Sequence, residues 1–233
     1  MFFCRICDVN IGVEHLHRAV PSFFHDYLTD TCPNPEIILK VFPAELEAEN
    51  ARYPEHDEYY NELMVIFKKL TTLMLDYDTF FFHSAVVELN GDGYIFTGKS
   101  GAGKSTHAML WQKYLGADVI NGDKPLFRLI DGKFYAYGNP WSGKEGLHKN
   151  SRVEVKAAAF IEQSSENSIA PISSAEVLTK LFNQAIYVNE PRLNGILLGL
   201  LDKFLLQIPF YRLECNISRE AAMLAYNTMK GEN

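Results

Sequence analysis

The sequence predicts an α/β fold with a mixed sheet, in which a β-hairpin precedes a glycine-rich loop, together with a small N-terminal α+β lobe. Three observations support this prediction. The stretch Gly98–Ser105 follows a short aromatic and β-branched run and comes before a helical pattern. Hairpin turn signals occur at residues 90–93 and 131–133, each between apolar runs. Apolar residues recur at helical spacing between residues 63 and 74.

The chain of 233 residues is expected to form a small lobe over residues 1–78 and a larger domain over residues 79–233. In the lobe we expect a strand at 5–13, a short apolar run at 37–42, a helix at 43–50 and a second helix from about 56. In the domain we expect strands at 80–89, 94–97, 126–130, 134–137, 153–161 and 210–215. Helices are expected at 106–115, at 173–184, from 191 onward and at 218–229.

The stretch from Gly98 to Thr106 satisfies G-x-x-x-x-G-K-[ST], the pattern of a phosphate-binding loop. Glycines let the backbone approach a phosphate, and successive N–H groups form an anion cradle that the following helix N-terminus completes. Lys104 is expected to reach the outer phosphates, and the Ser105 hydroxyl is expected to ligate Mg²⁺. The expected nucleotide-binding residues are Gly98, Ser100, Gly101, Ala102, Gly103, Lys104, Ser105 and Thr106.

Asp123 follows the apolar run Val119–Ile120. A carboxylate at this place can hold Mg²⁺ directly or through water, because this hard cation takes few protein ligands. The alternative is that Asp123 is a turn residue before Lys124 and Pro125.

A strand opening with His83, a hairpin and then G-x-S-G-x-G-K-S resemble the catalytic domain of HPr kinase/phosphorylase. They also resemble, more distantly, ATP-dependent phosphoenolpyruvate carboxykinase, and Thr106 matches the carboxykinase version. The resemblance runs from about His83 to Asp123, and more loosely through the C-terminus. It implies a HPr kinase-like P-loop fold that uses ATP and Mg²⁺ for kinase chemistry on a hydroxyl. It also implies a catalytic group of His83, Lys104 and Asp123, with His83 near the transferred phosphate.

In the resembled family the strand here ends in two adjacent aspartates, one for the metal and one beside the acceptor hydroxyl. This sequence has Gly122–Asp123 instead, and the resemblance implies that Asp123, the remaining carboxylate, is a second metal ligand. Three functions stay open. The first is a kinase that phosphorylates a hydroxyl, with serine the expected group, on a small protein, peptide or metabolite. The second is a regulatory module that binds ATP or ADP without turnover, which Gly122 favours. The third is a carboxykinase-type enzyme, for which the chain is short.

The stretch Gly138–Glu145 nearly repeats the phosphate-loop pattern, but Glu145 replaces the metal-binding hydroxyl. It is not expected to be a second nucleotide site. It is either a loop that closes over the first site or a surface connection with a packed tryptophan. In the first case the candidate lid or substrate residues are Trp141, Ser142, Lys144 and Arg152.

Composition narrows the class of partner. The formal net charge is −7, so binding to nucleic acid through bulk electrostatics is not expected. No apolar run reaches membrane-spanning length and no signal-peptide pattern is present, so we expect a cytoplasmic protein without a membrane partner. Cys4 and Cys7 have C-x-x-C spacing, and His15 and His17 are close together, but neither pair is expected to bind a metal. The family resemblance implies a homo-oligomer.

Overall fold

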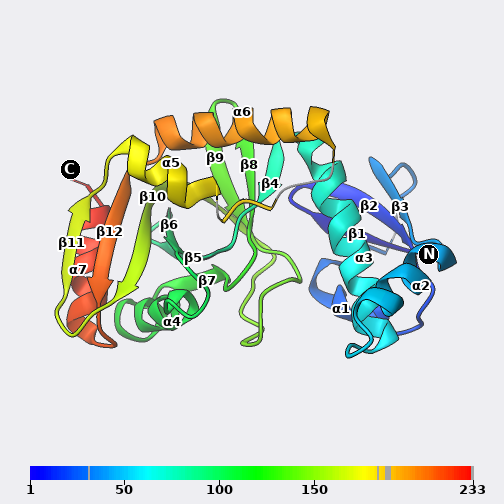
Figure 1. Cartoon of the computed structure of the whole chain (residues 1–233), viewed down its shortest axis with the longest axis horizontal. Coiled ribbons are helices and arrows are strands. Elements are labelled where there is room, and N and C mark those ends of the chain that lie inside the picture. Colours follow the sequence, from blue (N-terminus) through cyan, green and yellow to red (C-terminus); the bar gives the residue numbers. More distant parts are fainter. Residues whose placement is uncertain (31, 183, 187–189, 232–233) are drawn as a thin grey trace. The chain divides into compact units, whose positions relative to one another are not determined.

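The computed structural model of the chain describes residues 1–30, 32–182, 184–186 and 190–231 (Figure 1). The chain divides into two compact units, Met1–Tyr77 and Asp78–Asn233. The first unit contains a three-stranded sheet and the second a nine-stranded sheet. Each unit buries its own apolar side chains around its own sheet.

The sheet of the N-terminal unit has the order β1–β2–β3, with β1 and β2 antiparallel and β2 and β3 parallel. The single strand expected over residues 5–13 is wrong, because the backbone turns at Cys7 and Asp8, with φ of 55° and 60°. The two halves of that segment pair with each other. The elements of this unit are β1 (Phe2–Ile6), β2 (Val9–Glu14), α1 (Val20–Phe23), β3 (Ile37–Lys40), α2 (Pro43–Arg52) and α3 (Glu58–Leu73).

Helix α3 confirms the apolar stripe, since its buried face includes Leu63, Ile66 and Leu70. It begins where the Asp57 carboxylate accepts a hydrogen bond from a backbone amide of the first turn at 2.7 Å. A buried carboxylate, Glu62, lies on the same helix. Its oxygens accept two backbone N–H groups of the segment after β2, both at 2.6 Å, which satisfies its charge inside the unit.

The sheet of the C-terminal unit has the order β4–β8–β9–β10–β6–β5–β7, and β12 joins β10 and β11. Strand β10 runs parallel to β6 and β12 and antiparallel to β9. This unit is therefore an α/β structure with a mixed sheet, as the sequence predicts. Its elements are β4 (Thr79–Phe81), β5 (Ser84–Leu89), β6 (Asp92–Thr97), α4 (Lys104–Leu115), β7 (Asp118–Asn121), β8 (Leu126–Ile130), β9 (Lys133–Tyr137), β10 (Arg152–Gln163), β11 (Ser168–Pro171), α5 (Ser174–Phe182), α6 (Pro191–Gln207), β12 (Phe210–Cys215) and α7 (Arg219–Met229).

The predicted hairpin before the glycine-rich loop is confirmed. β5 and β6 are antiparallel, and Asn90 and Gly91 between them have φ of 57° and 87°, which is the pattern of a type I′ turn. The strand expected over residues 80–89 is instead interrupted. β4 pairs with β8, whereas β5 pairs with β6, so the chain changes partner at Phe82 and His83. His83 therefore lies between β4 and β5, outside the residue pairs that either strand makes with its partner.

Helices cover both faces of this sheet (Figure 1). On one face α4 and α7 pack over an apolar core that includes Trp111, Phe96 and Leu213. On the other face, Phe204 of α6 packs against Phe80 and aromatic residues of β8 and β9. α6 is apolar along much of its 17 residues, yet no helix of the described residues is long and apolar enough to cross a membrane.

Candidate functional site

The glycine-rich loop connects the end of β6 to the start of α4 and adopts left-handed backbone angles. Gly98, Gly101 and Gly103 have φ of 145°, 79° and 103°. A Cβ atom at Gly101 or Gly103 would meet no described atom within 4 Å. These glycines therefore border open space, and a ligand can come close to the backbone there. We refer to residues 98–105 as the phosphate loop.

The phosphate loop gathers donors and positive charge. Helix α4 begins at Lys104, and within the described chain no side chain caps its first amides, which leaves them able to bind an anion. Lys104 is buried, and its Nζ donates to the carbonyl oxygens of Gly98 at 3.2 Å and Lys99 at 3.3 Å. Burial lowers the pKa of Lys104, and the negative charge of Asp123 opposes that shift. N–H groups and an ammonium group at one place are what a phosphate chain needs.

Asp123, which follows β7, connects the phosphate loop to His83. The Ser105 hydroxyl donates to the carbonyl oxygen of Gly122 at 3.0 Å, next to Asp123 in the chain. Asp123 Oδ1 lies 3.1 Å from His83 Nε2, and Oδ2 lies 2.7 Å from Lys124 Nζ. The structure thus brings Ser105, Asp123 and His83 into one group, although they come from three different segments.

The Asp123 carboxylate is held in its ionised form. Burial alone raises the pKa of Asp123, but hydrogen bonds from His83 and Lys124, together with the positive charge of Lys124, outweigh burial and lower it to about 2. At neutral pH this group is therefore an oxygen donor with a full negative charge.

The oxygen donors of this group fit Mg²⁺. A hydroxyl from Ser105 and an ionised carboxylate from Asp123 are hard ligands on neighbouring segments, and Mg²⁺ prefers a few such ligands together with phosphate oxygens and water. In the described ranges, this site included, no three His, Cys, Asp or Glu side chains gather in a way that could hold a metal ion. Ser105 and Asp123 could therefore hold Mg²⁺ only together with phosphate oxygens and water.

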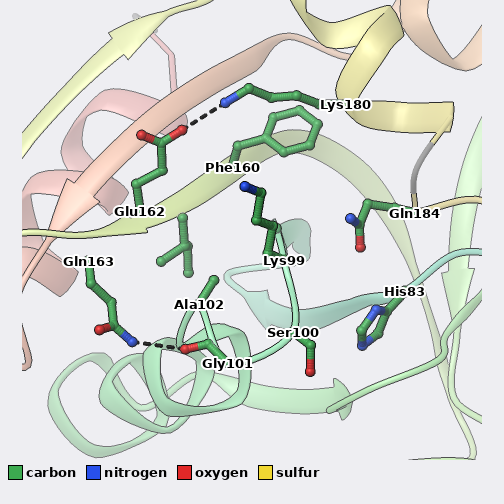
Figure 2. Close-up of a pocket in the computed structure, with 12 residues that line it drawn as sticks. His83, Lys99, Ser100, Gly101, Ala102, Phe160, Glu162, Gln163, Lys180 and Gln184 are labelled. Carbon is green, nitrogen blue, oxygen red and sulfur yellow. Dashed lines mark hydrogen bonds and ion pairs between the residues drawn. The ribbon is translucent and has the colours of Figure 1, made fainter.

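A cavity of about 870 Å³, here called the large cavity, opens beside the first half of the phosphate loop (Figure 2). His83 lies at one side of it and Glu162 and Lys180 at another, with Lys99 and Phe160 between them (Figure 2). Lys180 Nζ lies 2.7 Å from Glu162 Oε1 and 5.4 Å from the centre of the Phe160 ring. The large cavity therefore presents both signs of charge together with the imidazole of His83.

A second cavity of about 330 Å³ lies beside the other half of the phosphate loop. Its lining combines apolar side chains with a few polar groups, and Thr106 of the first turn of α4 is among them. Gly101 and Ala102 line both cavities, so the phosphate loop forms a partition between them. The further residues that line this second cavity include Leu110, Ile161, Ser164, Cys215, Asn216 and Ile217.

The segment Gly138–Leu147 packs against the end of β7 rather than standing clear of it. A Cβ at Gly138 would lie 1.9 Å from the carbonyl oxygen of Lys149, and a Cβ at Gly122 would lie 3.3 Å from that of Ser142. The Gly122 amide also donates to the carbonyl oxygen of Leu147 at 2.9 Å. This packing gives a physical reason for glycine at position 122, since a larger side chain there would meet backbone atoms.

Two buried asparagines that the sequence did not single out fasten this segment. Asn121 Nδ2 donates to the carbonyl oxygen of Asn139 at 3.1 Å, and its Oδ1 accepts the amides of Asp123 and Lys124, both at 2.9 Å. Asn139 Nδ2 donates to the carbonyl oxygen of Lys124 at 2.6 Å. These hydrogen bonds fix the backbone at Asp123 and Lys124 and thereby orient the Asp123 side chain. The sequence feature that could have identified Asn121 is its position at the end of an apolar strand, directly before Gly122 and Asp123.

The four candidate lid residues lie in different environments. Trp141 and Ser142 are buried, Lys144 is exposed, and Arg152 donates to the Tyr137 hydroxyl at 3.0 Å. Arg152 is the first residue of β10, and Glu154, two residues later, pairs with Asp92 at the start of β6. Arg152 is therefore separated from Phe160, which pairs with the last residue of β6 before the phosphate loop, by about 26 Å of strand. The structure does not bring Arg152 to this site, and a lid role for the other three stays a prediction.

Several residues of the large cavity were not anticipated. Phe160, Glu162 and Gln163 come from the C-terminal part of β10, and Lys180 and Gln184 come from α5 and the residues after it. Gln163 Nε2 donates to the carbonyl oxygen of Gly101 at 2.8 Å. No local pattern marks these residues, because β10 reaches the phosphate loop by pairing with β6, and Lys180 and Gln184 reach the cavity through the packing of α5 and the residues after it.

Comparisons with known proteins give limited guidance. No family model matches the chain, and no curated protein matches it in sequence. Among solved structures, the chain is similar to an Hpr(Ser) kinase/phosphatase from Coxiella burnetii at 11% identity and a TM-score of 0.36. The match covers 64% of this chain and 95% of that one. Values this low carry no argument about activity, so the function is argued from the residues described above.

Proposed function

We propose that this protein is an ATP- and Mg²⁺-dependent kinase that transfers the γ-phosphoryl group to a hydroxyl of a small protein, peptide or metabolite, with serine the expected group. The observation that carries the proposal is the position of Asp123. Its carboxylate is hydrogen-bonded to His83, which lines the large cavity, and its neighbour Gly122 accepts the hydrogen bond from the Ser105 hydroxyl of the phosphate loop.

Each part of the site has a role in the proposal. The loop amides and the N-terminus of α4 bind the phosphates, and Lys104 neutralises charge on the outer ones. Ser105 and Asp123 hold the metal, which when bound draws negative charge from the transferred group. His83 faces the acceptor from the large cavity. The bond between the γ-phosphorus and the bridging oxygen breaks, and a bond to the acceptor oxygen forms.

The single carboxylate is compatible with this chemistry. Phosphoryl transfer passes through a loose transition state, so catalysis depends on positioning and charge stabilisation more than on a strong base. Asp123 and His83 position each other through their hydrogen bond of 3.1 Å. The hydroxyl proton can leave through the His83 imidazole, which borders the large cavity.

The test is ADP release from ATP and Mg²⁺ in the presence of free serine and of serine-containing peptides, with the phosphorylated product identified by mass spectrometry. We expect acceptor-dependent ADP release that Lys104→Ala and Asp123→Asn both abolish. Lys113→Ala, in the last turn of the same helix, is the matched control and should leave the rate unchanged. Release without any phosphorylated acceptor would contradict the kinase proposal.

A second candidate is a nucleotide-binding regulatory module without turnover. Gly122 favours it, because this position lacks a second carboxylate and a Cβ there would lie 3.3 Å from the carbonyl oxygen of Ser142, which leaves little room for one. This candidate predicts that ATP binds with dependence on Lys104 while no acceptor elicits ADP release. The same assay therefore separates the two functions.

A further inference from the structure

Lys124 brings a positive charge to the candidate site from outside the phosphate loop. Its Nζ lies 2.7 Å from Asp123 Oδ2, whereas His83 Nε2 lies 3.1 Å from the other oxygen, Oδ1. The Lys124 side chain is 33% exposed. Its ammonium group is therefore accessible to a bound molecule rather than enclosed by the protein.

The backbone of Lys124 is fixed by side chains from the protein interior. Its amide donates to Asn121 Oδ1 at 2.9 Å, and its carbonyl oxygen accepts Asn139 Nδ2 at 2.6 Å. Both asparagines are fully buried. Pro125 follows directly, and its ring fixes its own φ. The Lys124 side chain therefore starts from a well-defined position, which is what a binding group needs.

Asp123 connects Lys124 to the residues that the phosphate-loop pattern assigns to phosphate. Burial lowers the pKa of Lys104 and the negative charge of Asp123 opposes that shift, so Asp123 lies within electrostatic reach of this lysine. The neighbouring Gly122 accepts the Ser105 hydroxyl at 3.0 Å. A phosphate chain that lies on the loop amides and contacts Lys104 and Ser105 therefore comes close to the pair of Asp123 and Lys124.

We propose that Lys124 binds the terminal phosphate of the nucleotide, with Asp123 holding its ammonium group in position. The inference rests on the proposed function and adds to it a substrate-binding residue outside the phosphate loop. An ammonium group has three N–H donors, so Lys124 can keep its contact with Asp123 and also donate to a phosphate oxygen. A carboxylate has about four lone-pair positions, so the same contact is compatible with Asp123 as a metal ligand. The positive charge of Lys124 also offsets the repulsion between Asp123 and the phosphates.

Isothermal titration with Mg²⁺ tests the assignment by comparing ATP with ADP, which lacks the terminal phosphate. Lys124→Met removes the charge but keeps a long side chain, and should weaken ATP binding about tenfold because a charge-assisted hydrogen bond is lost. ADP affinity should stay within about twofold, since that bond is not made to ADP. Lys124→Arg keeps the charge and should bind ATP within about threefold of the wild type. Unchanged ATP affinity in Lys124→Met, or an equal loss for ATP and ADP, would overturn the inference.

Lys149→Met is the matched control, because it removes the same kind of ion pair at the other end of β7. Lys149 Nζ lies 2.6 Å from Asp118 Oδ2, and Asp118 begins β7, whereas Asp123 follows its end. Lys149→Met should change neither affinity. A loss of ATP affinity equal to that of Lys124→Met would mean that net charge alone accounts for the effect, and would overturn the assignment to Lys124.

A second set of variants separates binding of phosphate from mere neutralisation of Asp123. ATP affinity is compared, in EDTA to remove divalent cations, between Asp123→Asn and the double variant that also has Lys124→Met. The loss due to Lys124→Met should persist at about fivefold in the Asp123→Asn background, because the contact with phosphate does not need the Asp123 charge. A loss that disappears there would overturn the inference. The proposed function fails separately, if the wild type binds ATP but no acceptor elicits ADP release, and a wild type that binds no ATP would contradict both.

Discussion

Two segments of this chain share the spacing G-x-x-x-x-G-K, but Gly101 and Gly103 of the first have different surroundings from Gly138 of the second. In the phosphate loop, a Cβ at Gly101 or Gly103 would meet no described atom within 4 Å. In the segment Gly138–Leu147, a Cβ at Gly138 would lie 1.9 Å from one carbonyl oxygen and 2.7 Å from another. Gly101 and Gly103 leave room for a ligand, whereas Gly138 leaves room for the protein's own backbone, as does Gly98, where a Cβ would lie 3.0 Å from the carbonyl oxygen of Ile161.

The elements that the two segments lead into explain the difference. The phosphate loop leads into α4, whose uncapped first turn adds N–H donors. The other segment leads back to the end of β7, where the Asn121 and Asn139 side chains fasten it. A glycine spacing therefore indicates a close approach of something to the backbone, and only the neighbouring structure determines whether that is a ligand or another part of the chain.

The largest expected effect is on stability at Gly138. Gly138→Ala should lower the free energy of unfolding by about 3 kcal/mol or more, because the new methyl group meets backbone oxygens that cannot move independently. Gly101→Ala should cost about 1–2 kcal/mol, from the left-handed angle alone, but should weaken ATP binding. Urea denaturation and calorimetric titration measure both quantities. Equal losses of stability would remove the distinction between the two segments.

The next effect compares the lysines of the two segments. Lys104→Ala should lower ATP affinity about 10- to 100-fold, since charge-assisted hydrogen bonds to phosphate are lost. Lys144→Ala should change it by less than about twofold, because Lys144 is exposed on a segment packed against β7. Titration with ATP and Mg²⁺ measures both. A similar loss in Lys144→Ala would mean that this side chain closes over the phosphates, as a lid would.

The helix behind the phosphate loop contributes a pH dependence for which the other segment has no counterpart among its described residues. His107 of α4 is buried, and its Nε2 accepts the Trp111 indole N–H at 3.1 Å. Burial lowers the pKa of His107 from 6.5 to about 4. The folded state therefore favours neutral His107, and its contribution is present above pH 6.5 and is lost as the pH falls from 6.5 toward 4.

Between pH 7 and pH 5 we expect this histidine to cost the wild type about 2 kcal/mol of unfolding free energy. His107→Gln keeps an acceptor for Trp111 but does not titrate, so its stability should fall less over the same interval. Urea denaturation at both pH values gives the comparison. Parallel pH profiles for the two proteins would show that His107 does not titrate with folding.

Local patterns were sufficient for much of the fold. The Asn90–Gly91 turn predicted the hairpin because a type I′ turn needs two residues that tolerate positive φ. Ser218 predicted the start of α7, where its Oγ accepts the Ala221 amide at 3.2 Å. The turn at Cys7 and Asp8 had no such signal, since neither glycine nor asparagine stands there, and the pattern therefore predicts one continuous strand.

The candidate site likewise contains residues that local patterns predict and residues that they do not. The phosphate loop lies within one continuous segment, so its residues could be named from spacing alone. The contact between His83 and Asp123 joins residues forty positions apart through β5 and β7, and the sequence suggested both only through a family resemblance. The Lys180–Glu162 pair and the two asparagines depend on how α5 and residues 138–147 pack, which no spacing in the chain encodes.

The smallest expected effect decides whether the segment Gly138–Leu147 moves. Trp141 is buried, with its ring centre 6.4 Å from that of Phe81 in an edge-to-face arrangement. If the segment is a fixed wall, Trp141→Phe should lower the unfolding free energy by about 1 kcal/mol, from the smaller ring. ATP affinity and turnover should then stay within about twofold. If turnover instead falls while urea denaturation is unchanged, the segment closes over the phosphate loop during the reaction, and its fastening by Asn121 and Asn139 is released in each cycle.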